Sequence, residues 1–133
     1  MPRIFILLLL FPALANPSDF RCKISEVMDI QENGKLQDNS EKILSLGNIG
    51  EEFVVDGTTG RIIGSQLLIN SDWGTPRVLR PGADNDHLLI LTVNTTNHEV
   101  YVLDVAVWMP NMPFIYFSSV WGVTTGVCSR VNY

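Results

Sequence analysis

Few residues in this sequence can carry chemistry. Among 133 residues there are two histidines and two cysteines, and 9 basic residues face 14 acidic ones without forming a basic cluster. The net charge of −5 argues against nucleic acids and anionic membrane surfaces as partners. There is no Cys-x-x-Cys pair for redox exchange or metal binding, and no glycine-rich phosphate loop. The sequence therefore predicts no cofactor.

Long apolar runs are also scarce, and the one at the N-terminus is too short to span a membrane. Residues 4–10 are all apolar and are followed by a phenylalanine and a proline, whereas a transmembrane helix needs about 20 apolar residues. Arg3 before the run and Ala13-Leu14-Ala15 after it are typical of a cleaved secretory leader. We therefore predict a signal peptide over residues 1–15.

The remaining residues, 16–133, have the length of one domain. We expect this domain to be secreted or periplasmic and not to span a membrane. Cys22 and Cys128 stand near its two ends, and in an exported chain an even pair with no other thiol predicts a disulfide. Closing a loop of about 100 residues would restrict the unfolded chain by up to ~4.7 kcal/mol.

Apolar residues recur with a period near two, and turn residues interrupt them at short intervals, which favours strands over helices. We predict about eight strands, over residues 20–30 with a bulge near Glu26, 52–55, 61–69, 76–79, 88–93, 100–108, 114–121 and 123–128. The polar stretch 37–42 is expected to be loop. The predicted fold class is all-β, a single antiparallel meander that closes into a small barrel or a sandwich because sheet edges must be hidden.

Two glycine-containing segments predict tight turns. Asn33-Gly34 and the Asp56–Gly60 segment tolerate left-handed backbone, so the chain can reverse at both places. A ligand-binding role for Thr59-Gly60-Arg61 is the weaker alternative to plain hairpin chemistry. Gly64 in the return strand predicts a bulge or a close backbone approach.

Several short motifs follow one another in a recognisable order. They are Phe20-x-Cys22, Glu52-Phe53-Val54-Val55-Asp56, Thr59-Gly60-Arg61-Ile62-Ile63-Gly64, Val78-Leu79-x-Pro81-Gly82, Met112-Pro113-Phe114 and Thr125-Gly126-x-Cys128. In this order the chain resembles a family of small exported bacterial proteins of uncharacterised function with a cysteine near each end. It departs from that family at Gly57 and Met112, where basic residues are more usual. The resemblance implies a Gram-negative periplasmic or secreted setting and supplies no activity.

One loop gathers groups that could act in catalysis or metal binding. Asp84, Asp86 and His87 are three donors within four residues, and a triad with Ser118 or Ser119 can be drawn. No Gly-x-Ser-x-Gly elbow accompanies them, the calcium-loop spacing is missing, and the donors are too few for structural zinc. We expect a solvated acidic turn, assign no catalytic residue and no metal, and keep a small hydrolase or metal-dependent enzyme at this loop as the alternative function.

Aromatic residues gather in the last third of the chain. On a strand, Phe114 and Tyr116 share one face, while Phe117 and Trp121 share the other. Both faces are therefore apolar, as in a fully buried strand or in a strand with one face left for a partner. Asp104 interrupts one face of the preceding strand, which we expect to be wetter.

A β-domain that binds something usually does so through aromatic side chains. The candidate contact residues are Trp108, Phe114, Tyr116, Phe117 and Trp121. The sequence thus favours a binding or interaction domain over an enzyme, with an apolar ligand, a cell-envelope component or another protein as the partner. An accessory role within a larger envelope assembly is a third possibility.

Overall fold

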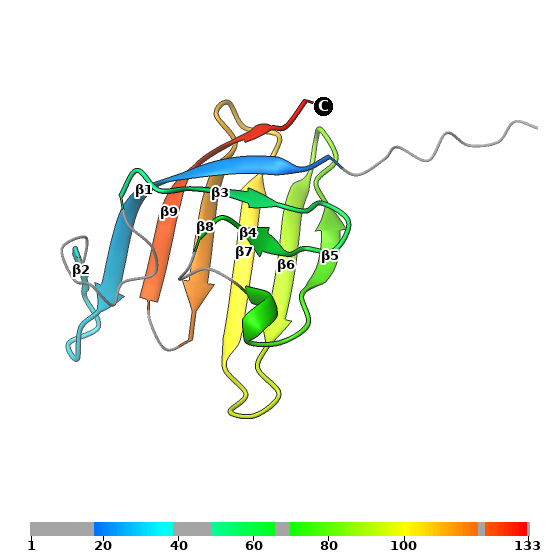
Figure 1. Cartoon of the computed structure of the whole chain (residues 1–133). Helices are drawn as coiled ribbons and strands as arrows, with labels where there is room; N and C mark the ends of the chain where they lie inside the picture. Colours follow the sequence, from blue (N-terminus) through cyan, green and yellow to red (C-terminus); the bar gives the residue numbers. More distant parts are fainter. Residues whose placement is uncertain (1–17, 39–48, 66–69, 120–121, 133) are drawn as a thin grey trace, which may run out of the picture.

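The computed structural model describes residues 18–38, 49–65, 70–119 and 122–132 (Figure 1). The predicted leader and Trp121 lie outside the described residues. Within the described ranges, no helix has the length and apolar character needed to cross a membrane.

The described residues form one antiparallel sheet of nine strands, which confirms the all-β prediction. The strand order is β4-β3-β1-β9-β8-β7-β6-β5, and β2 pairs with β1 outside this path. The strands are β1 (Phe20–Ile30), β2 (Leu36–Asp38), β3 (Glu52–Val55), β4 (Ile62–Ile63), β5 (Arg77–Pro81), β6 (His87–Val93), β7 (Val100–Ala106), β8 (Pro113–Ser118) and β9 (Gly122–Arg130), and a short 3-10 helix, η1, spans Asn70–Asp72.

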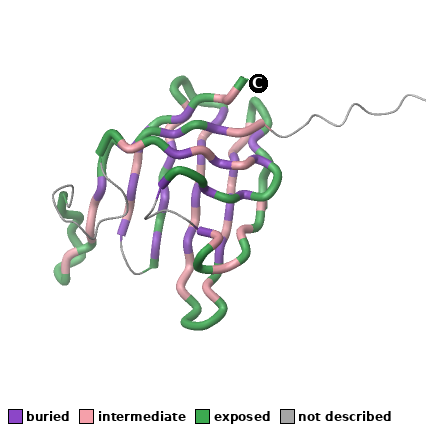
Figure 2. The backbone as a smooth tube through the Cα atoms, viewed as in Figure 1, coloured by how far each residue is buried: buried purple, intermediate pink, exposed green. Residues whose placement is uncertain are grey.

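The sheet is curled into a half-barrel with the core on its concave side. Strands β5 to β9 run as a meander, while β1 and β3 cross in front of β7 and β6 and cover the concave side (Figure 1). Buried and more exposed residues alternate along β6 to β9 (Figure 2). The core therefore comes from every second residue of these strands, together with buried side chains of β1, β3 and β4.

A disulfide joins the first and last strands, as predicted. Cys22 on β1 lies directly opposite Cys128 on β9, with 4.0 Å between the Cα atoms, and their sulfur atoms are bonded. Both residues belong to the buried core. The covalent link thus holds together the one strand pair that connects the meander to β1, β2, β3 and β4.

The β1–β9 pairing contains a bulge between Ile24 and Glu26, close to the predicted position. Gly126 lies opposite Ile24. A Cβ atom at position 126 would overlap the carbonyl oxygen of Lys23 and the ring of Phe114. Glycine is therefore required here for close approach of the two strands.

The turn predicted at Asp56–Gly60 joins β3 to β4. The Asp56 carboxylate accepts the backbone N–H groups of Thr58 (2.8 Å) and Thr59 (3.0 Å), and its pKa is lowered chiefly by the bond from Thr59. Gly60 has φ +77°, and a Cβ there would press on the side chain of Ile90 in the core. Hairpin chemistry therefore accounts for this segment.

The return strand is much shorter than the predicted span of 61–69. Gly64 has φ +93°, which turns the chain out of the sheet after Ile63, and residues 66–69 lie outside the described ranges. The buried Asn70 side chain then makes the hydrogen bonds that a neighbouring strand would make. It accepts from Ile62 N–H at 3.0 Å and donates to Gly60 C=O at 2.9 Å. The edge of β4 is thereby capped.

The prediction of loop over 37–42 was wrong in part, because residues 36–38 form β2. The Asn33-Gly34 turn, with Gly34 at φ +80°, returns the chain onto the end of β1, and Leu36 pairs with Ile30. All three β2 residues are exposed, so this edge strand needs no apolar alternation. Because β2 lacks apolar alternation, the sequence pattern did not predict it as a strand.

Arg130 ties the end of β9 to the turn between β5 and β6. Its Nη2 donates to Gly82 C=O at 3.0 Å and to the Asp84 carboxylate at 2.7 Å. The same guanidinium lies 5.1 Å from the ring centroid of Phe20, at the start of β1. These contacts hold one end of the half-barrel together at a place where the described strands form no backbone ladder.

The close approach at Gly126 leads to a stability prediction. Replacing Gly126→Ala should lower the free energy of unfolding by roughly 1–3 kcal/mol, because the added methyl forces β1 and β9 apart. Ser129→Ala, an exposed position on the same strand, should change it by less than about 0.5 kcal/mol. Urea unfolding midpoints measure both. Equal stability of the two variants would contradict the tight pairing.

Candidate functional site

The aromatic residues predicted to contact a partner divide between the two faces of the sheet. Phe114 and Tyr116 point into the core, where Phe114 packs edge-on against Phe53 with ring centroids 5.3 Å apart. Phe117 and Trp108 are exposed by 38% and 55%. The alternation predicted from the sequence is thus present, and only the second pair is available to a partner.

We call the convex side of β6 to β9 the outer face, and it carries a band of apolar side chains. The band comprises Leu89, Leu91, Val102, Ile115, Phe117, Val123 and Val127, and the polar residues His87, Asp104 and Thr125 lie on the same side of the sheet. Leu91, Val102, Phe117 and Val123 lie opposite one another in register and form one apolar row across four strands. An antiparallel sheet packed on one side normally has a polar second side, so this composition is unusual.

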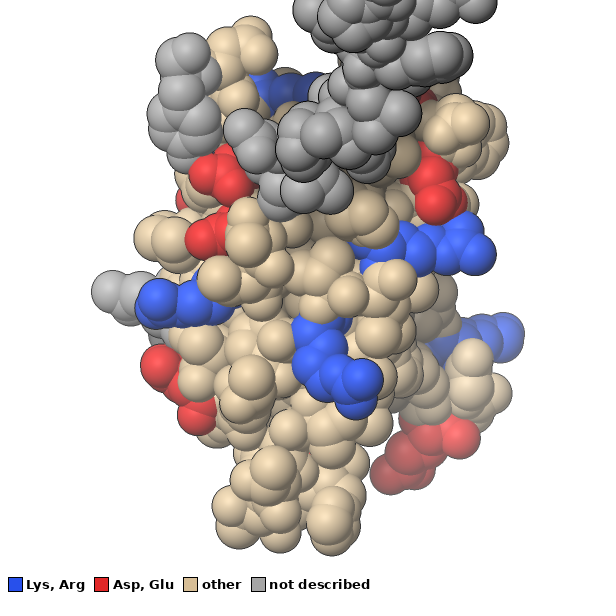
Figure 3. Space-filling model, turned by 90° about the vertical axis from the view of Figure 1, so that its right-hand side faces the viewer, with Lys and Arg blue, Asp and Glu red and all other residues tan. Residues whose placement is uncertain are grey.

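Charged residues border the outer face. Lys23 on β1 lies opposite Val127, and on the other side Arg77 on β5 lies opposite Leu91. The view onto the β5 side of the molecule shows Lys and Arg side chains separated from one another by uncharged and acidic residues, without a continuous basic field (Figure 3). The band is therefore an apolar surface with scattered charges at its margins.

Within the outer face, Asp104 and His87 form a pair. His87 lies at the start of β6 and Asp104 on β7, and the imidazole Nδ1 is 2.6 Å from the Asp104 carboxylate. The indole Nε1–H of Trp108 donates to His87 Nε2 at 3.3 Å. Because an indole N–H can only donate, Nε2 must be the unprotonated nitrogen, and Nδ1–H then donates to Asp104.

A shallow depression of about 220 Å³ lies beside this pair. It is open to solvent, and its walls combine the two polar side chains with apolar groups, since it is lined by His87, Asp104, Ala106, Pro113, Phe114 and Ile115. This volume is below the ~300–1,000 Å³ of drug-sized ligand pockets. The depression therefore has room for a small group or one side chain of a partner.

An imidazole oriented by a carboxylate is the arrangement of a general base. Acyl transfer also needs a nucleophile, and the residues that line the depression include no serine, threonine or cysteine. The arrangement can therefore accept or hold a proton at His87 Nε2, while the described residues that line the depression offer no nucleophile.

Asp84, Asp86 and His87, the three donors of the predicted loop, each interact with a different partner. The Asp84 carboxylate pairs with Arg130 at 2.7 Å, Asp86 pairs with Arg80 at 2.7 Å, and His87 turns to Asp104. Among the residues that the structure describes, no group of three His, Cys, Asp or Glu side chains is placed to hold a metal ion.

The partnership of His87 with Asp104 was not predicted from the sequence, although a signal for it exists. Asp104 was noted as the residue that breaks an apolar face. Pairing 88–93 with 100–108 as a hairpin would have placed it diagonally across from His87, since His87 lies opposite Ala106. The pairing of His87 with Asp104 can be predicted only when the register between β6 and β7 is known.

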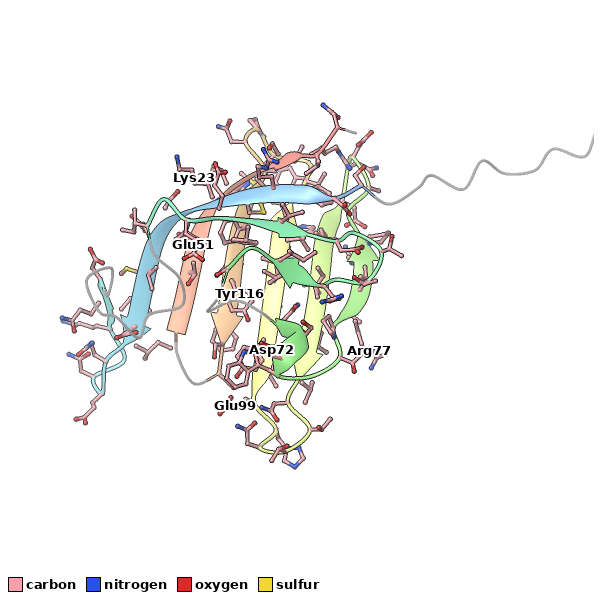
Figure 4. All side chains as sticks on the ribbon, in the orientation of Figure 1. Lys23, Glu51, Asp72, Arg77, Glu99 and Tyr116 are labelled. Carbon is pink, nitrogen blue, oxygen red and sulfur yellow. A yellow bond between two sulfur atoms is a disulfide. The ribbon has the colours of Figure 1, made fainter. Side chains whose placement is uncertain are left out.

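Two tyrosines on the concave side were not singled out together either. Tyr101 is buried; its hydroxyl donates to Glu99 at 2.5 Å, and burial is the main cause that raises its pKa. Tyr116 lies on the neighbouring strand β8 (Figure 4). Its ring centroid is 6.5 Å from that of Tyr101. Its hydroxyl is buried, which raises its pKa, and it has no hydrogen-bond partner among the described residues.

Comparisons of the chain with models of protein families, with curated proteins and with solved structures gave no significant match. The resemblance noted in the sequence therefore stays a prediction, and function is inferred from the geometry.

The two tyrosines should respond in opposite ways to loss of their hydroxyls. Tyr101→Phe removes a hydrogen bond to a carboxylate and should lower the free energy of unfolding by roughly 1.5–3 kcal/mol. Tyr116→Phe removes a buried hydroxyl for which the described residues provide no hydrogen-bond partner, and it should leave stability unchanged or raise it. Chemical unfolding of both variants measures this difference. Equal losses would show that the Tyr116 hydroxyl is satisfied in solution.

Proposed function

We propose that this chain is an exported binding domain that contacts its partner through the outer face of β6 to β9. The observation that carries the proposal is the apolar band, with its uninterrupted row Leu91, Val102, Phe117 and Val123; Ile115, Phe117 and Val127 are each exposed by about 40%. Contiguous apolar patches of this kind on soluble domains mark interaction sites. Trp108 beside the band adds an exposed aromatic of the type that dominates interface energies.

The edges of the sheet offer less to a partner than this face. Edge strand β5 carries Arg77, Arg80, a bulge and a terminal Pro81, which are devices that discourage strand addition. At the other edge, β4 has two residues and is capped by Asn70. Docking on the outer face is therefore favoured over addition of a strand.

The signal-like N-terminus and the disulfide support the exported setting. Disulfides form and persist in oxidising compartments, and Cys22 and Cys128 account for all cysteines of the chain. A periplasmic or secreted location, as the family resemblance also implies, belongs to this proposal.

The enzyme alternative has weaker support. Asp84 and Asp86 are paired with arginines, and the His87–Asp104 pair lacks a neighbouring nucleophile. A binding role uses features that are present, whereas the described lining of the depression supplies no side-chain nucleophile for hydrolysis through a covalent intermediate.

Capture of a partner tests the role of the outer face. Residues 16–133 are immobilised, exposed to periplasmic extract, and the retained proteins are identified by mass spectrometry. The double variant Phe117→Thr/Val127→Thr should retain at least tenfold less of the wild-type partner, because two exposed apolar contacts are lost. Threonine keeps strand propensity, so the fold should persist.

The matched control is Ile63→Thr/Leu79→Thr, which removes two apolar residues that lie on β4 and β5 and are more exposed than Phe117 and Val127. It should retain the partner at the wild-type level. Loss of the partner by the control, or retention by the outer-face variant, would place the contact elsewhere.

Export is tested separately. The full chain produced in a Gram-negative host should be recovered outside the cytoplasm with Asn16 as its first residue and with no free thiol. N-terminal sequencing and thiol titration measure both properties. An intact Met1 or two free thiols in the recovered protein would contradict export.

A further inference from the structure

The contact between Trp108 and His87 depends on the protonation state of the imidazole. The indole N–H points at His87 Nε2 from 3.3 Å, and Nδ1 is committed to Asp104. When His87 gains a proton, the proton must enter at Nε2. Two N–H donors, one from each ring, then face each other and can no longer bond directly.

Two convergent N–H donors are a binding site for an acceptor. The oxygen of a bound anion can accept from His87 Nε2–H and Trp108 Nε1–H together, and bonds to a charged donor are the stronger kind. Both rings are accessible from solvent: the His87 side chain is 35% exposed and Trp108 is 55% exposed. The acceptor can therefore arrive without opening the core.

The charged groups around the imidazole limit the anion to a single charge. Asp104 on β7 contacts Nδ1, and Asp86 on the preceding turn also faces the histidine but is paired with Arg80 of β5. The β8 residues on this side, Pro113 and Ile115, are uncharged. The imidazolium and the Asp104 carboxylate together carry no net charge, so each negative charge on the ligand adds repulsion from Asp104, and a monoanion is favoured over a dianion.

The apolar residues that line the depression indicate the chemistry of the part of the ligand beyond its anionic group. Ala106, Pro113 and Ile115 line the depression and offer only apolar surface. A short hydrocarbon chain attached to the anionic group would cover them and be removed from water. The ligand that fits both parts has a carboxylate head and a small apolar body.

We propose that the depression lined by His87 and Asp104, together with the indole N–H of Trp108 that contacts His87, binds a small apolar carboxylate, and that binding is coupled to uptake of a proton by His87. This inference deepens the proposed function by naming a ligand class on the outer face. Imidazole is the side chain that changes charge between pH 5 and 8. Binding is therefore tight in acid and weak in base.

Titration of the mature protein with hexanoate tests the site, with the Trp108 indole N–H resonance as the probe. The resonance is assigned by its loss in Trp108→Phe. Hexanoate should shift it, and the affinity should be about tenfold or more higher at pH 5.5 than at pH 7.5. Hexan-1-ol, which has the same chain without the charge, should bind weakly at both pH values.

Variants of the two histidines locate the proton. His87→Gln keeps a polar side chain but cannot gain a charge, so its hexanoate affinity should be low and independent of pH. His98→Asn, an exposed change in the β6–β7 turn at φ +61°, should keep the wild-type pH dependence. Thermal unfolding confirms that both variants fold.

Equal binding of hexanoate and hexan-1-ol would show that the depression is only an apolar contact and would overturn the proposal. Retained pH dependence in His87→Gln would overturn it as well. The capture experiment changes Phe117 and Val127, which do not line the depression. Failure of the carboxylate site and failure of the partner surface are therefore distinguishable.

Discussion

The pairing of β1 with β9 is the interaction on which the rest of this structure depends. It joins the β5 to β9 meander to the β1–β4 segment, which crosses the concave side and completes the core. The contact between Cys22 and Cys128 fixes this pairing covalently, and Gly126 allows the backbones to approach at the bulge. Without this pair the inner faces of β6 to β8 would lose the strands that shield them from water.

Most strands could be predicted because their cause is local. Residues 20–30 and 52–55 were predicted to their observed ends, since alternation and flanking turns both mark them. The errors have non-local causes. The polar strand β2 exists because the turn at Gly34 lays it on β1, and the strand predicted over 61–69 ends early because Gly64 adopts φ +93° and Asn70 takes over its hydrogen bonds.

The candidate site was predictable only in outline for the same reason. Alternation placed Phe114 and Tyr116 on one face and Phe117 on the other, but it could not say which face the core occupies. That choice is made by β1 and β3, which cover the concave side. The partners of His87 likewise depend on hairpin register, since Asp86 is its neighbour in sequence but Asp104 is its neighbour in space.

The composition of β6 to β9 leaves apolar side chains exposed to water on one side of the sheet. Both sides of β6, β7 and β8 are mainly apolar, yet the curl of the sheet encloses only one of them. Exposed apolar surface is costly in water, and here it is confined to the middle of the sheet while charged side chains stand on the flanking strands β1 and β5. Asp104 and His87 lie within that apolar surface and satisfy each other, so the face has polar groups of fixed geometry inside an apolar setting. This combination, rather than apolar area alone, gives a surface the means to select what it binds.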